Sequence, residues 1–218
     1  MKTLILFLLS TLLSFAQENN VSLRLMAFPR SADDSPVQLN LGERTIDVQL
    51  AANCLSDPYT VPAMEAWDFG QRTTDGEGKS TFESWGRGKA RSAKRQIVIL
   101  LRKGPKNADG FRVLTLNDGP KHFDERQLLF YNLSLEDIAG EVGGVKFALK
   151  PAQHKVITPK ADQGKDLCHA SLLLMKNDKW RPFMESNWPL KKDTRGLIFL
   201  YTDPATSKVR LHTIRDFL

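Results

Sequence analysis

The segment "WGRGKARSAKRQ", residues 85–96, contains the residue types most suited to binding an anion. Five basic side chains follow a tryptophan within twelve positions. Clustered lysine and arginine attract anionic groups, so this segment is a candidate edge for an anionic glycan or a lipid headgroup. Its residues are Trp85, Arg87, Lys89, Arg91, Lys94 and Arg95. The alternative is a solvated turn between neighbouring strands, because charged loops are common on protein surfaces.

Catalytic chemistry has weaker support in the sequence. None of the four histidines falls in a metal-binding pattern such as His-X-His or His-Glu-X-X-His. Cys168 and His169 are adjacent, but neighbours in a strand point to opposite faces. The "DGEGKS" segment at 75–80 lacks the first glycine of a phosphate-binding loop, since residue 73 is threonine. We therefore expect no catalytic residue, metal ligand or cofactor. The alternative is a hydrolase in which the fold brings His169 or His212 to a carboxylate.

A glycan-binding surface is a further alternative, and it depends on exposed tryptophans. Two aromatic side chains would have to lie on one face, and Trp67 and Trp180 are the candidates. Trp85 and Trp188 are expected in a core or an interface instead, because tryptophan is usually mostly buried.

The elements that would position these residues are strands. Polar and apolar residues alternate in "RTIDVQLA" at 44–51 and in "VKFAL" at 145–149, as in half-buried strands. "QIVILL" at 96–101 and "GLIFLY" at 196–201 are continuous apolar runs, typical of central strands covered on both faces. The Asp-Gly pair in "TDGEGK" at 74–79 predicts a hairpin turn. The chain is therefore expected to be all-β, with helix confined to a turn or two.

The chain also repeats itself. Residues 82–104 align with 183–203, which places Trp85 over Trp188 and Arg95 over Arg195, each arginine just before a buried strand. Further matches in the same order are 21–29 with 126–134, 41–50 with 142–151, and 112–118 with 210–216. The pattern predicts two tandem antiparallel β-sandwiches from an internal duplication, at 17–119 and 120–218. "WPLKKDTR" in the second copy is also basic, which favours the solvated-turn interpretation of residues 85–96.

The first residues predict export. A positive start is followed by the apolar run 4–16, with Ser14 and Ala16 placed for cleavage before Gln17. The run is shorter than the roughly 20 residues that span a bilayer, although an uncleaved anchor is the alternative. We expect residues 1–16 to be a signal peptide and the mature chain to be soluble, not membrane-spanning, in the periplasm or outside the cell.

Export narrows the classes of partner. The formal net charge of the whole chain is +6, which is mild, and an exported protein rarely meets nucleic acid. The expected partners are an envelope protein, an anionic glycan or a lipid headgroup. Export also permits a disulfide between Cys54 and Cys168, and the sequence leaves open whether they are bridged or free.

Two segments resemble parts of known exported proteins. "TTDGEGKSTF" at 73–82 is similar to the turn and strand of bacterial immunoglobulin-like modules. "NLSLEDIAGEVGGVKFALKPAQHKVI" at 132–157 is similar to a strand, hairpin and strand of small exported sandwich proteins. The resemblance implies immunoglobulin-like domains and a non-enzymatic binding or scaffolding role, and it assigns no functional residue.

Overall fold

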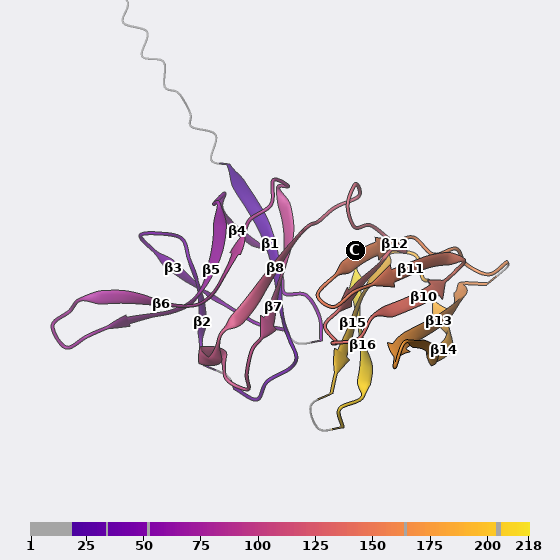
Figure 1. The fold of residues 1–218 in the computed structure, drawn as a ribbon. Helices are drawn as coiled ribbons and strands as arrows, with labels where there is room; N and C mark the ends of the chain where they lie inside the picture. The colour runs from indigo at the N-terminus through magenta and orange to yellow at the C-terminus, as the bar shows by residue number, and fades with distance from the viewer. Residues whose placement is uncertain (1–18, 34, 52, 164, 204–205) are drawn as a thin grey trace, which may run out of the picture.

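The computed structural model describes residues 19–33, 35–51, 53–163, 165–203 and 206–218, which form an all-β protein (Figure 1). The expected signal peptide, 1–16, lies outside the described residues. The first eight strands are β1 (Asn20–Phe28), β2 (Val37–Asn40), β3 (Thr45–Val48), β4 (Tyr59–Pro62), β5 (Ala66–Thr74), β6 (Ser80–Lys89), β7 (Arg95–Arg102) and β8 (Phe111–Asn117). The others are β9 (Leu128–Asn132), β10 (Ile138–Val142), β11 (Val145–Leu149), β12 (His154–Ile157), β13 (Leu167–Lys176), β14 (Lys179–Pro189), β15 (Thr194–Thr202) and β16 (Val209–Phe217).

Helix is confined to one 3-10 turn, η1 (Asn107–Asp109), in the part of the chain that the structure describes. No helix in that part is long and apolar enough to cross a membrane. The predicted hairpin joins β5 to β6, and Asp75 holds its turn by accepting hydrogen bonds from the main-chain N–H groups of Glu77 and Lys79. The left-handed residue of this turn is Gly78, with φ of 80°.

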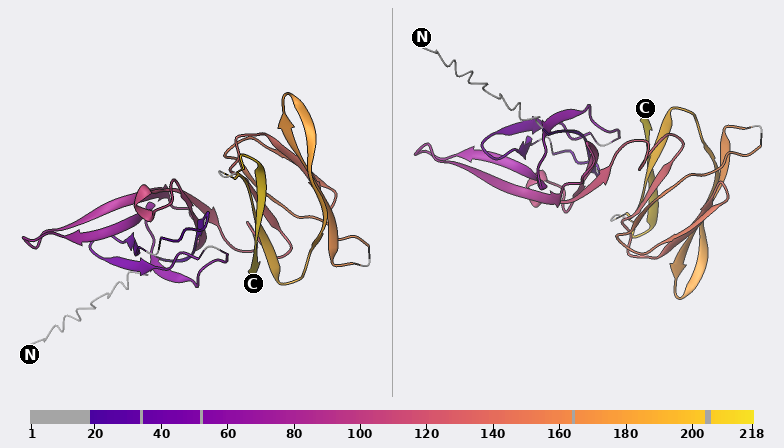
Figure 2. Two further views of the ribbon diagram at one scale, coloured as in Figure 1. Left: turned by 90° about the horizontal axis from the view of Figure 1, so that it is seen from below. Right: turned by 90° about the horizontal axis from the view of Figure 1, so that it is seen from above.

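The two halves of the chain have the same topology. Strands β1–β8 form the sheets β4-β1-β7-β8 and β3-β2-β5-β6, and strands β9–β16 form β12-β9-β15-β16 and β11-β10-β13-β14. Each strand of the first half thus has a counterpart eight strands later. The halves lie side by side, and the connector between β8 and β9 contains the predicted boundary at 119/120 (Figure 2).

One feature of the predicted sheets is wrong. The sequence predicts antiparallel sheets, but β1 pairs with β7 in parallel, and β9 pairs with β15 in the same way. The sheets β4-β1-β7-β8 and β12-β9-β15-β16 are therefore mixed. Alternation of polar and apolar residues indicates a strand but does not specify the direction of its partner.

The four sheets make four layers with three apolar cores. One core fills the space between the two sheets of the first half, and a second does so in the second half. The third lies between the halves, where the two mixed sheets face each other; we call this interface the seam. Its buried members are Met26, Phe28, Leu55, Ile97, Ile99 and Leu101 of the first half and Phe123, Leu129, Tyr131, Leu197, Phe199 and Ile214 of the second.

The seam explains the continuous apolar runs. In β7, Val98 and Leu100 face the core of the first half, while Ile97 and Ile99 face the seam. The run 197–200 of β15 divides in the same way between the seam and the core of the second half. Both faces of these strands are covered, as the sequence predicts, so a polar residue is excluded from either side.

The strand ladders correct one detail of the repeat. Each outer sheet has one bulge, with Trp85 as the extra residue of β6 and Phe183 as the extra residue of β14. Aligning the bulges matches Trp85 with Phe183, so the predicted match of Trp85 with Trp188 is wrong. The match of Arg95 with Arg195 holds, because Arg95 lies beside Asp118 and Arg195 beside Asp216 at the same place in each half.

Candidate functional site

The basic stretch of residues 85–96 is only partly a connector. Its first residues, Trp85 to Lys89, belong to β6, and the chain then crosses to the other sheet of the sandwich and enters β7 at Arg95. The predicted turn between β6 and β7 thus crosses from one sheet of the sandwich to the other. Trp85 is buried, whereas the basic side chains of the stretch, Arg87, Lys89, Arg91, Lys94 and Arg95, are exposed.

A buried glutamine gives this crossover a structural role. The Gln96 amide donates to the carbonyl oxygens of Arg91 and Ala93, at 2.7 and 2.9 Å. Its Oε1 accepts from the main-chain N–H of Arg91 and from Nε1 of Trp67, at 3.1 and 2.9 Å. Arg91 also donates through Nε to the carbonyl oxygen of Thr115. These contacts fix the path of the crossover between Arg91 and Gln96.

The tryptophans do not form a platform. Trp67 is fully buried, and Trp180 is 44% exposed on β14. Trp85 is buried in the first core, and Trp188 stacks on Phe130 with ring centroids 6.0 Å apart. The pair of exposed rings that the glycan alternative needs is thus reduced to one, Trp180.

The cysteines and histidines are dispersed as well. Both thiols are free: Cys54 is exposed in the first half, and Cys168 is buried in the core of the second. His169 is exposed, 3.7 Å from the exposed Glu185, and His212 packs on Phe28 in the seam. Across the described residues, no three histidine, cysteine or acidic side chains are grouped so that they could hold a metal ion.

The strongest cluster of charge is buried at the seam. Arg195 donates to Asp118 through Nη1 and to Asp216 through Nε, at 2.6 and 2.8 Å. Arg24 of the first half forms a bidentate pair with Asp216, at 2.7 and 2.9 Å. Arg95 contacts the second oxygen of Asp118 at 3.2 Å. The cluster ties β1 to β16 and the end of β8 to β15, so it clamps the two halves together.

Electrostatics keep the carboxylate of Asp118 ionised. Burial raises the pKa of Asp118, but the hydrogen bond from Arg195 and the charges of Arg195 and Arg95 outweigh burial, so this pKa lies below its usual value. Asp118 and Asp216 are 6% and 3% exposed. Both carboxylates are bonded within the protein, and a substrate in solvent cannot reach them.

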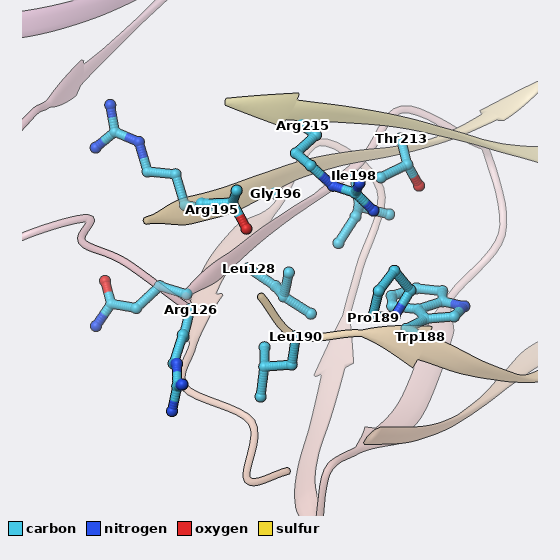
Figure 3. A pocket seen from close by; sticks show the side chains of 12 residues that line it. Arg126, Leu128, Trp188, Pro189, Leu190, Arg195, Gly196, Ile198, Thr213 and Arg215 are labelled. Carbon is cyan, nitrogen blue, oxygen red and sulfur yellow. The ribbon is translucent and has the colours of Figure 1, made fainter. Parts of the chain in front are cut away.

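A pocket in the second half has the geometry of a binding site. It has a volume of about 240 Å³ and lies between the end of β14 and the strands β9, β15 and β16 (Figure 3). Its apolar walls are Leu128, Trp188, Pro189, Leu190 and Ile198, and Gly196 forms part of its floor. The side chain of Arg195 points away from it, toward Asp118 and Asp216 (Figure 3). We call this hollow the open-edge pocket.

The open-edge pocket corresponds to a difference between the two halves. In the first half, Trp67 and Gln96 occupy the corresponding space and are bonded to each other at 2.9 Å. The ladders match these residues with Ala170 and Gly196, which fill much less volume. The side chain of Trp188 in β14 fills only part of the space that Trp67 and Gln96 fill in the first half, and the rest is the pocket.

A second difference between the halves keeps β14 apart from β16 at the edge of the second sandwich. In the first half, β6 lies directly on β8, and a Cβ added at Gly86 or Gly88 would approach Phe111 or Val113 to within 2.6–2.9 Å. The bulge alignment places Met184 and Ser186 at these positions in β14. Side chains there prevent β14 from closing on β16 as β6 closes on β8, because atoms cannot interpenetrate.

Two arginines border the open-edge pocket. Arg126 and Arg215 have no ion pair within the described ranges, and the buried Nε of Arg126 has no hydrogen-bond partner. Arg126 has the left-handed φ of 57°, which is uncommon for a residue with a side chain. The pocket can therefore receive an apolar group that carries a negative charge beside it.

Sequence reasoning missed this pocket, although part of the signal was present. Once Arg95 is placed over Arg195, the next residues are Gln96 and Gly196, a large polar side chain against none. The loss of Trp67 could not be seen, because its match with Ala170 depends on the position of a bulge.

Comparisons with known proteins give no family. No protein-family model matches the chain, and no curated protein is similar to it in sequence. The structure itself shows an all-β protein of four small sheets in two similar halves.

Proposed function

We propose that the protein is an exported, non-enzymatic binding protein that holds a protein partner at the open-edge pocket. The observation that carries the proposal is the divergence of the halves: Trp67 and Gln96 fill the first sandwich, while Ala170 and Gly196 leave the second open. The seam and its ion-pair cluster join the halves and so hold the pocket on a rigid support. The apolar run 4–16 supports export.

The chemistry of the pocket specifies the group it accepts. Its volume is below the roughly 300–1,000 Å³ of sites for drug-sized molecules, so it suits one side chain better than a whole ligand. Arg126 and Arg215 favour a carboxylate next to that side chain. The partner is therefore a protein that presents an apolar side chain beside an acidic group.

The proposal includes the ancestry of the fold. The matched strand order, the bulge in each outer sheet and the pairs Arg95–Asp118 and Arg195–Asp216 support duplication of one immunoglobulin-like sandwich. After duplication, one copy kept a closed edge, and the other acquired the pocket.

The test compares the open-edge pocket with the basic stretch 85–96 in the mature chain, residues 17–218. Immobilised wild type, Gly196→Gln and Arg215→Glu are exposed to an envelope extract, and the retained proteins are identified by mass spectrometry. Gly196→Gln places in the pocket the side chain that Gln96 contributes to the first half, and the nearest obstacle is the flexible end of Leu128, 2.8 Å from the new Cβ. We expect both variants to lose a partner that wild type retains.

The matched control is the triple variant Arg87→Glu, Lys89→Glu, Arg91→Glu, which reverses charge on the exposed basic stretch. It should retain the same partner. Loss of the partner by the triple variant alone would move the site to the basic stretch. Loss of all binding at raised salt, with an anionic polymer or lipid as the retained material, would replace the protein partner with that ligand.

A further inference from the structure

A second hollow, separate from the open-edge pocket, opens where the two halves meet. It has a volume of about 810 Å³ and is lined by the ends of β1, β7, β9 and β15 and the start of β8. We call it the seam groove. Its apolar lining includes Phe28, Leu101, Leu133, Leu135 and Tyr201, and its charged lining consists of Arg30, Arg102, Lys103 and Arg112.

The apolar wall of the seam groove has an exposed part and a buried part. Leu135 is 85% exposed, whereas Phe28 and Leu101 are buried. Behind it, Phe28 stacks on Phe199 with ring centroids 4.8 Å apart and meets Tyr201 edge-on at 5.3 Å. These rings belong to the seam, so the wall is formed before any ligand arrives.

The charge around the seam groove has one sign. All four charged residues that line it are cations, and no carboxylate is among the lining residues. Arg30 and Lys103 are exposed and make no ion pair in the described part of the chain. Four cations beside an apolar surface make the groove complementary to a molecule that is both apolar and negatively charged.

The other two cations are held at the groove by their neighbours. Arg102 donates to the carbonyl oxygen of Pro29 at 3.1 Å and to the side chain of Asn107. Arg112 donates to the hydroxyl of Tyr131. Asp33 attracts Arg102, but the oxygens of Asp33 accept hydrogen bonds from Ser35 and Asn107. Its charge therefore neutralises only part of the rim.

The main chain at the groove argues against an extended peptide. Peptides that add to a sheet need a free strand edge. Here Phe28 is paired with Leu101, and Thr202 with Val209, and the strands β1, β7, β9 and β15 all lie inside their sheets. The start of β8, an edge strand, is packed against β6. A flexible hydrocarbon chain needs apolar surface alone, and the volume lies within the range of small-molecule sites.

We propose that the seam groove binds a single-chain amphiphile with an anionic headgroup, a carboxylate or a phosphate. The hydrocarbon chain lies along Leu133, Leu135 and Tyr201, and the headgroup meets Arg30 and Lys103 at the rim. The site goes beyond the proposed function, because it shares no lining residue with the open-edge pocket.

Calorimetric titration of the mature chain tests this assignment, with each charged amphiphile kept below its micelle concentration and dodecanol below its solubility limit. The probes are laurate, dodecyl phosphate, lauroyl lysophosphatidylglycerol, dodecanol, acetate and inorganic phosphate. We expect the charged amphiphiles to bind, dodecanol to bind about tenfold more weakly through loss of the headgroup contact, and the two small anions not to bind. Binding of laurate but not the lysolipid identifies a free fatty acid as the ligand, and the reverse identifies a phospholipid.

Variants locate the binding. Arg30→Glu with Lys103→Glu should weaken the affinity for laurate about tenfold or more. Leu135→Asp should have an effect of the same size, because it removes apolar contact with the hydrocarbon chain of the ligand. Arg87→Glu with Lys89→Glu makes the same charge change outside the groove and should have no effect. Equal affinity for laurate and dodecanol overturns the proposal, as does equal weakening in the control. Binding of an acidic apolar peptide such as acetyl-Leu-Glu-Leu-Glu-Leu-amide, when no amphiphile binds, overturns it too.

The open-edge variants keep the two proposals distinguishable. Gly196→Gln and Arg215→Glu should leave laurate affinity unchanged, whether or not they lose a protein partner. Circular dichroism and the melting temperature of each variant show whether it is folded. A seam-groove variant that binds laurate as wild type does refutes the site even if the open-edge pocket is confirmed.

Discussion

At the scale of single residues, the best-defined features are buried polar groups that stabilise the structure. Arg195 has a fully buried side chain with two carboxylate partners, and the arrangement recurs in weaker form at Arg95. Removing one partner of a buried charge costs more than the interaction contributes, because the remaining charge is left unpaired.

Asp118→Asn should therefore lower the free energy of unfolding by about 3 kcal/mol, measured by urea denaturation. Arg195 would lose one of its two anionic partners while remaining buried. The control is Glu141→Gln, which breaks an exposed pair with Lys146 and should cost less than about 1 kcal/mol. Equal small losses in both variants would show that Arg195 does not need Asp118.

The two thiols should differ in reactivity. Cys54 is exposed, whereas Cys168 is 1% exposed, and burial together with the charge of Asp162 raises the pKa of its thiol. Titration of the native reduced protein with Ellman's reagent at neutral pH should modify one cysteine per chain, and unfolding should release the second. Cys54→Ser should abolish the native reaction, and a persisting reaction would mean that the core of the second half opens.

At the scale of elements, the sequence specifies strands better than their partners. Alternation predicted β3 and β11, and the apolar runs predicted β7 and β15 as doubly covered. The parallel pairing of β1 with β7 was not predictable, since a strand of either direction presents the same faces. The second error, the alignment of Trp85 with Trp188, was caused by the bulges. An extra residue at Trp85 and at Phe183 shifts the register, so the two tryptophans occupy different positions in the two halves although the residue type is the same.

The packing of β6 on β8 in the first half should require the glycines of β6. Gly86→Val would place a Cβ 2.8 Å from the carbonyl oxygen of Phe111, a backbone atom that cannot move aside cheaply. We expect a loss of about 2 kcal/mol from overpacking, measured by urea denaturation. Gly76→Ala at the hairpin tip has open space around it and should be nearly neutral. A tolerated Gly86→Val would mean that β6 can lift from β8, and the contrast between the halves would weaken.

At the scale of the whole molecule, the seam turns two sandwiches into one body. The inner sheets bury large apolar side chains such as Met26 and Phe199 against each other, so neither half could present this face to water without cost. The continuous apolar runs at 96–101 and 196–201 predicted strands covered on both faces. They did not indicate that one of the two covering layers is the other half of the chain. The seam groove follows from the same fact, because it forms where the ends of strands from both halves meet.

Acid should loosen the whole molecule through this seam. The folded-state pKa of Asp118 is depressed, so its contribution to stability is fully present above the unfolded carboxyl pKa of about 4 and is lost as the pH falls through the lower folded value. Protonation removes the charge that Arg195 and Arg95 require, and the clamp between β8 and β15 weakens. The melting temperature of wild type should therefore fall as the pH drops below about 4. Asp118→Asn should start lower at pH 7 and fall less over this interval; parallel curves for the two proteins would place the acid-sensitive group elsewhere.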